Sequence, residues 1–263
     1  MSRGSASTSV HDADRRRFEA ALASVHARQG WFERALRIVI RGWCRVTAWR
    51  FSAVVTEPLP VRAGVSGAGC IVTAAPHRAW VEPFLLVAAW PAEAARLVWL
   101  ADGRTVTRSW WRRRLLPRLG VIPIATTAGP RAYAELAATA CQRGLAVAVF
   151  PEVGPPSLPD RCRRISPGFA YLALRAGAPV VPVVIGGTHH IVRGSSFSVD
   201  IGAAIDPGEV MADPFTPDGR ERAQALAGEL ERAVAAVLPE RTRRADASAP
   251  AHDRWTWLAS LFG

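Results

Sequence analysis

Between residues 70 and 185, short apolar runs alternate with segments whose apolar residues have helical spacing. Strands that are apolar on both faces and alternate with helices are typical of a mostly parallel sheet covered by helices. We therefore predict an α/β fold with a mostly parallel central sheet flanked by helices. The predicted strands are 70–75, 95–101, 121–125, 145–151, 179–185 and 197–201, and the predicted helices are 81–90, 109–118, 130–143, 167–176 and 220–238.

This sheet is predicted to lie in one domain at residues 57–240, with segments of different composition on both sides. Residues 1–14 are polar and are expected to form a disordered tail. Residues 15–56 are expected to form N-terminal amphipathic helices at a membrane interface. Residues 241–263 begin with charged and small residues and end in a Trp-rich stretch, so we expect a flexible C-terminal tail.

The segment from Trp31 to Phe51 places arginines on one helical face and large apolar side chains on the other. A helix with arginines beside Trp and Phe is typical of a lipid interface. An ordinary helix packed on a domain also keeps its arginines in solvent, so the sequence leaves both interpretations open. The arginines are Arg34, Arg37, Arg41 and Arg45, and the apolar side chains are Phe32, Leu36, Val39, Ile40, Trp43 and Val46.

Composition points to an anionic partner. The formal net charge is +11, which suits lipid headgroups, phosphorylated substrates or nucleic acid. The chain also holds 10 Trp, a residue enriched at membrane interfaces, and lacks a recognised nucleic-acid motif, so nucleic acid ranks last. No apolar run reaches the ~20 residues that span a bilayer. We therefore expect a peripheral protein on the cytoplasmic face of a membrane.

The 4 cysteines are scattered and form no Cys-x-x-Cys pair. Reduced, structural thiols are the expected state in a cytoplasmic protein. No group of His and Cys residues has metal-ligand spacing, so we predict no metal site.

His77 lies on a turn between the predicted strand 70–75 and the predicted helix 81–90. Pro76 ends the strand because it has no N–H to donate to a ladder. Imidazole exchanges a proton near neutral pH, and a carboxylate can hold its tautomer and stabilise the imidazolium. Glu82 follows five positions later, a separation of about 140° on an ideal helix. The two side chains can therefore meet only if His77 precedes the first helical turn and Glu82 lies within it.

A second carboxylate, Glu152, follows the predicted strand 145–151 and opens a loop rich in Gly and Pro. The carboxyl ends of parallel strands carry the ligand sites of such sheets. A carboxylate placed there can accept hydrogen bonds from the hydroxyl groups of a polar substrate.

Four stretches, in this order and spacing, resemble the motifs of the glycerolipid (lysophospholipid) acyltransferase family, whose members acylate glycerol phosphate and lysophosphatidate. The resemblance covers roughly residues 65–190. The first motif of the family is His, four residues and Asp, and here it runs from His77 to Glu82. The other three correspond to residues 120–126, to residues 150–157, which stand where the family has Phe-Pro-Glu-Gly-Thr-Arg-Ser, and to the Val-Pro strand 180–185.

This chain departs from the family where the family uses arginines to hold the phosphate of the acceptor. Thr126 stands at the arginine position of the second motif, and Pro155 stands near that of the third. The departure implies an acceptor without a terminal phosphate, such as a glycolipid, or replacement by other arginines. Candidates for replacement are Arg131, Arg161, Arg163 and Arg164, although the last three also suit a solvated loop. The resemblance thus implies a substrate site with Glu152, Val153, Gly154, Thr126 and Arg131.

The resemblance implies acyl transfer from acyl-CoA or an acyl carrier protein to a hydroxyl of a lysophospholipid or glycolipid, without a further cofactor. His77 would act as general base and Glu82 would orient it. The implied partners are the lipid acceptor, the acyl donor and the membrane surface. Two alternatives remain: a thioesterase that uses the same residues to activate water, and a non-catalytic membrane-surface protein of the same fold. A Gly-x-Ser-x-Gly nucleophile elbow is absent from the sequence.

Overall fold

The computed structural model describes residues 22, 34–40, 42–43, 46–47, 49–59, 69–104, 108–124, 129–154, 158–189, 191–207 and 216–247. The predictions for the tail at 1–14, for Thr126, for Pro155 and for the Trp-rich end of the chain lie outside these residues.

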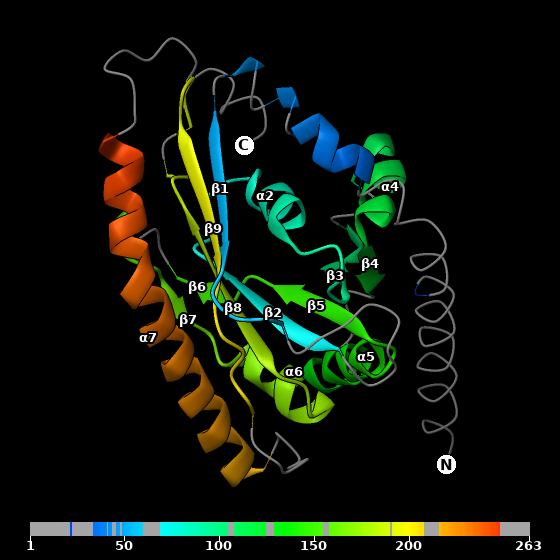
Figure 1. Cartoon of the computed structure of the whole chain (residues 1–263). Coiled ribbons are helices and arrows are strands. Elements are labelled where there is room, and N and C mark those ends of the chain that lie inside the picture. The colour runs from blue at the N-terminus through cyan, green and yellow to red at the C-terminus, as the bar shows by residue number, and fades with distance from the viewer. Residues whose placement is uncertain are drawn as a thin grey trace.

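A seven-stranded sheet with the order β1-β9-β8-β2-β5-β3-β4 forms the centre of the molecule (Figure 1). Its neighbouring strands pair in parallel except for β8 and β9, which are antiparallel. The prediction of a mostly parallel central sheet is therefore confirmed. The strands are β1 (Arg50–Val55), β2 (Cys70–Ala75), β3 (Arg96–Asp102), β4 (Val121–Ile124), β5 (Leu145–Val149), β8 (Val180–Gly186) and β9 (Ser196–Ile201). Glu152–Val153 (β6) and Arg164–Ile165 (β7) form a separate antiparallel pair.

Helices cover both faces of the sheet, which explains why its strands are apolar throughout. Alternate residues of β2 face different cores: Ile71 and Ala75 lie in one core with α5, α6 and α7, and Val72 and Ala74 lie in the other with α2. The helices are α2 (Glu82–Ala89), α4 (Trp110–Leu115), α5 (Pro130–Gln142), α6 (Gly168–Ala176) and α7 (Pro217–Ala247), with a 3-10 turn, η1, at Leu116–Leu119.

The end of α7 corrects the predicted boundary at residue 240. The helix includes Pro239 and continues to Ala247, so residues 241–247 are not part of a flexible tail. Tertiary contacts hold this last part of the helix. Arg241 forms an ion pair with Asp200 of β9, and the Thr242 hydroxyl donates to the carbonyl of Pro159 at 3.0 Å.

The N-terminal segment 15–56 also differs from its prediction at one end. Residues 34–40 are helical, but residues 50–55 form β1, which pairs in parallel with β9 from Arg50↔Ser196 to Val55↔Ile201. Pairing with a strand some 145 residues away decides this conformation, which the local helical spacing of the sequence did not indicate.

No helix among the described residues combines the length and the apolar character that crossing a membrane requires. Within the same residues, His, Cys, Asp and Glu side chains do not gather in a group of three or more that could hold a metal ion.

Candidate active site

The carboxyl ends of three neighbouring strands, β2, β5 and β8, meet at one edge of the sheet. Each is followed within three residues by a polar side chain of the site: His77 follows β2, Glu152 follows β5 and Thr188 follows β8. The parallel arrangement thus brings together residues that lie 75 and 106 positions apart in the chain.

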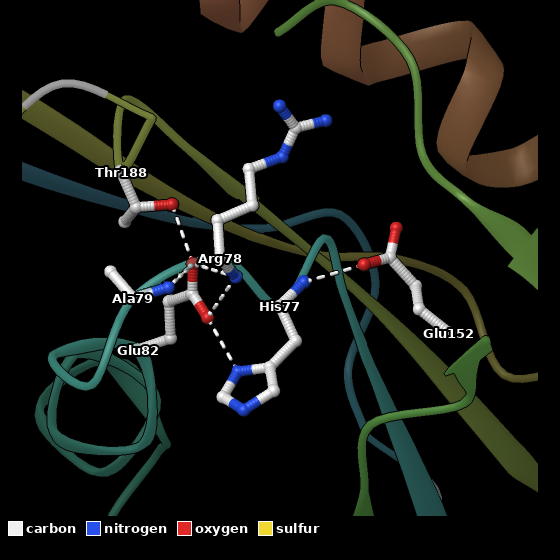
Figure 2. Close-up of polar contacts among 6 residues, drawn as sticks. All are labelled: His77, Arg78, Ala79, Glu82, Glu152 and Thr188. Atoms are coloured by element: carbon white, nitrogen blue, oxygen red, sulfur yellow. Dashed lines mark hydrogen bonds and ion pairs between the residues drawn. The ribbon is translucent and has the colours of Figure 1, made fainter. Parts of the chain in front are cut away.

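His77 and Glu82 are in direct contact. Nδ1 of His77 lies 2.6 Å from Oε2 of Glu82 (Figure 2). Because α2 begins at Glu82, His77 lies before the first helical turn, as a separation of five residues requires. An ionised carboxylate can only accept hydrogen bonds, so the contact places the proton of a neutral imidazole on Nδ1 and leaves Nε2 as an acceptor.

The carboxylate of Glu82 is fully buried, and each of its oxygens is held by several donors. The backbone N–H of Arg78 lies 2.9 Å from both oxygens, and the N–H of Ala79 lies 3.1 Å from Oε1. The hydroxyl of Thr188 donates to Oε1 at 2.6 Å. Such charge-assisted hydrogen bonds offset the cost of removing a carboxylate from water.

The imidazole of His77 is packed on one face and partly exposed to solvent. It stacks on the ring of Phe150, with ring centroids 4.0 Å apart and an interplanar angle of 21°. Its side chain is 44% exposed, and no described residue forms a hydrogen bond with Nε2. The ring can therefore take a proton at Nε2 from a molecule that approaches from solvent.

Glu152 contacts the backbone of the site. Oε2 accepts the N–H of His77 at 2.8 Å, and Oε1 accepts the N–H of Arg163, also at 2.8 Å. Its neighbours Val153 and Gly154 follow in β6 and in the turn after it, where Gly154 has a φ of +97°. Glu152 therefore joins the turn of His77 to the segment that carries Arg163.

Arg78 reinforces the same connection. Its guanidinium donates to the carbonyl of Leu158 at 2.8 Å and also to the carbonyl of Arg161. Burial lowers the pKa of the Arg78 guanidinium, while the nearby Glu152 and Glu82 act in the opposite direction. The side chain points away from the His77 ring in Figure 2, so it anchors the turn rather than approaching the reacting edge of the imidazole.

The candidate arginines are divided between two places. Arg131 is exposed in the first turn of α5, which follows the edge strand β4. Arg161, Arg163 and Arg164 instead line a groove of about 630 Å³ between their own segment and α7. The α7 side of this groove presents Glu231, Ala235, Leu238 and Pro239.

Three residues of the site were not singled out by the sequence: Phe150, Arg78 and Thr188. Phe150 and Arg78 stand beside predicted site residues, which was a usable signal. Thr188 follows two glycines at the carboxyl end of the strand predicted at 179–185. Its contact with Glu82 depends on β8 lying next to β2, an arrangement that the sequence did not give.

Residues 54–186 match the sequence model of the family described as Acyltransferase, and this match spans half of the chain. The chain belongs to the acyltransferase family. The recognition of an acyltransferase from its motifs is thus confirmed. A comparison with curated proteins gave no match.

A solved structure shows the same fold. The chain is similar to the 1-acyl-sn-glycerophosphate (LPA) acyltransferase PlsC from Thermotoga maritima, with 18% sequence identity and a TM-score of 0.50. The similarity covers 72% of this chain and 71% of that protein. At this level of identity it supports the α/β architecture of the acyltransferase domain.

Proposed function

We propose that this acyltransferase moves a fatty acyl group from an acyl thioester, acyl-CoA or acyl carrier protein, to a hydroxyl of a lysophospholipid or glycolipid. The observation that carries the proposal is the 2.6 Å contact between His77 Nδ1 and Glu82 Oε2, on a His77 side chain that is partly exposed to solvent. The lysophospholipid class of acceptor is also supported by the substrate named for PlsC, which shares the fold.

In the proposed reaction, Nε2 of His77 accepts the proton of the acceptor hydroxyl while the hydroxyl oxygen attacks the thioester carbonyl carbon. Glu82 stabilises the imidazolium that forms, because its carboxylate lies at Nδ1. The tetrahedral intermediate collapses, the bond between carbon and sulfur breaks, and the leaving thiolate takes the proton back from Nε2. The products are the acylated lipid and the free thiol, and no covalent acyl-enzyme is needed.

Membrane lipids reach the site more readily if the protein binds to the membrane surface, which we also propose. The helical segment around residues 34–46 supports this, because Ile38, Val39, Trp43 and Val46 are 47–77% exposed. The same segment is attached to the domain on another side, where Arg37 donates to the carbonyl of Trp90 at 2.6 Å. Exposed apolar residues on an attached amphipathic helix suit the interface of a bilayer.

For acceptors with a phosphate, we propose that the segment carrying Arg161, Arg163 and Arg164 supplies the cations. A guanidinium fork matches the oxygens of a phosphate. This segment is connected to the His77 turn through Glu152 and Arg78, so a headgroup held there has a fixed relation to the catalytic turn.

The test is an acyl-transfer assay with purified protein, liposomes, acyl-CoA or acyl carrier protein, and a panel of lysolipid and glycolipid acceptors, read by mass spectrometry. Acceptor-dependent product that is lost in His77→Ala would support the proposal and name the acceptor. Thioester cleavage without acylated lipid would instead support the thioesterase alternative. Tight liposome binding without turnover would support a non-catalytic membrane-surface protein.

A further inference from the structure

We propose that Thr188 is a positioning residue for acyl transfer: its hydroxyl fixes the Glu82 carboxylate so that Oε2 faces His77. The inference rests on the proposed function for its effect on turnover. The contact itself is independent of that function, since the Thr188 hydroxyl lies 2.6 Å from Glu82 Oε1. Thr188 is only 4% exposed, so water does not readily replace this donor.

The hydroxyl of Thr188 is the only side-chain donor to Oε1 of Glu82 among the described residues. The other donors to Oε1 are the backbone N–H groups of Arg78 and Ala79, which belong to the same turn as His77. Thr188 approaches instead from the end of β8 (Figure 2). Thr188 therefore connects the carboxylate to the sheet. The backbone N–H groups alone would connect it only to the turn that carries His77.

The chain before Thr188 is shaped to bring it to Glu82. Gly187 has a φ of +86°, a conformation that side chains other than glycine rarely adopt. A Cβ atom at Gly187 would lie 2.0 Å from the carbonyl oxygen of Ser196, so the strand end and the next segment are also in close contact. This turn redirects the backbone after β8 toward the start of α2.

The residue after Thr188 is also held. His189 Nε2 lies 2.7 Å from Asp246 Oδ1 near the end of α7. Thr188 is thus fixed on both sides, by the Gly187 turn and by the attachment of His189 to α7. A hydroxyl fixed in this way can hold the carboxylate in one orientation, which a mobile donor could not do.

The test compares Thr188→Val, which keeps the shape and removes the hydroxyl, with Thr188→Ser, which keeps the hydroxyl. In acyl transfer, we expect Thr188→Val to lower kcat by about tenfold or more and to change the acceptor KM by less than about twofold. Thr188→Ser should recover most of kcat. Equal kcat for Thr188→Val and the unmodified protein, or equal loss in both variants, would overturn the proposal.

A second measurement does not require turnover. The downfield proton resonance of the His77 Nδ1–H, assigned by its loss in His77→Ala, reports the hydrogen bond to Glu82. We expect this resonance to persist in Thr188→Ser and to move and broaden in Thr188→Val. An unchanged resonance in Thr188→Val would contradict the proposal. If the resonance changes clearly but the protein has no acyl-transfer activity, the contact is established and only the proposed function is wrong. If thermal unfolding shows that Thr188→Val is not folded, Thr188→Ala removes the same hydroxyl without added bulk and takes its place.

Discussion

Oε2 of Glu152 accepts the backbone N–H of His77 at 2.8 Å, although the two residues belong to different strand ends. Its other oxygen accepts the N–H of Arg163. The sequence indicated a carboxylate that binds acceptor hydroxyls. In the structure both oxygens face the protein backbone, so positioning of the His77 turn is a direct alternative, and kinetics can separate the two roles.

We expect Glu152→Gln to lower kcat more than it raises the acceptor KM. A glutamine keeps one acceptor oxygen but turns an NH₂ donor toward one of two N–H groups, which makes that contact unfavourable. The expected loss of stability is about 1–3 kcal/mol, measured by urea unfolding. A large rise in KM with kcat unchanged would show that Glu152 binds the acceptor instead.

The length of the Glu82 side chain is predicted to matter, although relatives with this motif use Asp. Glu82→Asp shortens the side chain by one methylene and withdraws the carboxylate from Thr188 and His77, so we expect kcat to fall by roughly 10- to 100-fold. Glu82→Gln places an NH₂ group among N–H and O–H donors, and we expect a loss of about 3 kcal/mol in stability as well as activity. Steady-state kinetics and thermal unfolding of both variants test this, and full activity in Glu82→Gln would contradict the role of a charged partner.

Two glycines with positive φ provide a matched pair. At Gly187 (φ +86°) a Cβ would lie 2.0 Å from the Ser196 carbonyl oxygen, whereas at Gly154 (φ +97°) a Cβ meets nothing within 4 Å. We expect Gly154→Ala to cost about 1 kcal/mol from backbone strain alone. Gly187→Ala should cost several times more, roughly 3 kcal/mol or above, because backbone must move. Similar midpoints of urea unfolding for the two variants would show that this contact relaxes easily.

Stability is predicted to fall at alkaline pH because burial raises the pKa of several acidic groups, Cys141 and Tyr133 among them. Burial raises the pKa of Cys141 and that of Tyr133 each to about 12. The unfolded groups ionise at lower pH, near 9.0 and 10.0, so the unfolded state binds fewer protons above that range. The contribution of these protonated groups to the free energy of unfolding is therefore fully present below about pH 9. It is lost as the pH rises toward the pKa values of the folded protein.

Urea unfolding at a series of pH values from neutral to strongly alkaline checks this decline. Cys141→Ala and Tyr133→Phe should each make the decline shallower, although Tyr133→Phe also loses a 2.6 Å hydrogen bond to the Leu100 carbonyl at every pH. The slope against pH is thus the informative quantity. An unchanged slope in both variants would exclude these groups as its cause.

Much of the site could be predicted because its residues stand at strand ends. Apolar runs before His77 and Glu152 marked two buried strands, and in a parallel sheet the carboxyl ends of such strands lie on one edge. Local spacing also showed that His77 and Glu82 could meet only across a helix start, and α2 does begin at Glu82. These inferences depend on residues close in sequence, whose spacing predicts the local conformation of the chain.

Other features depended on which strands became neighbours. Residues 50–55 were included in the segment 15–56 that we expected to be helical, yet they form β1 beside β9. Likewise, the helix predicted at 220–238 continues through Pro239 to Ala247, where contacts of Arg241 and Thr242 hold its end. In both cases tertiary packing outweighs a local preference of about 1–3 kcal/mol.

The sequence by itself determined the alternation of strands and helices, the two strand ends with His77 and Glu152, and the motifs of an acyltransferase. Only the tertiary structure decided that Glu152 would contact the backbone of His77 and that Thr188 would reach Glu82. These two contacts join residues 75 and 106 positions apart, and they depend on β5 and β8 lying on either side of β2. Local periodicity records which face of a strand is buried, but it does not record which strand lies beside it.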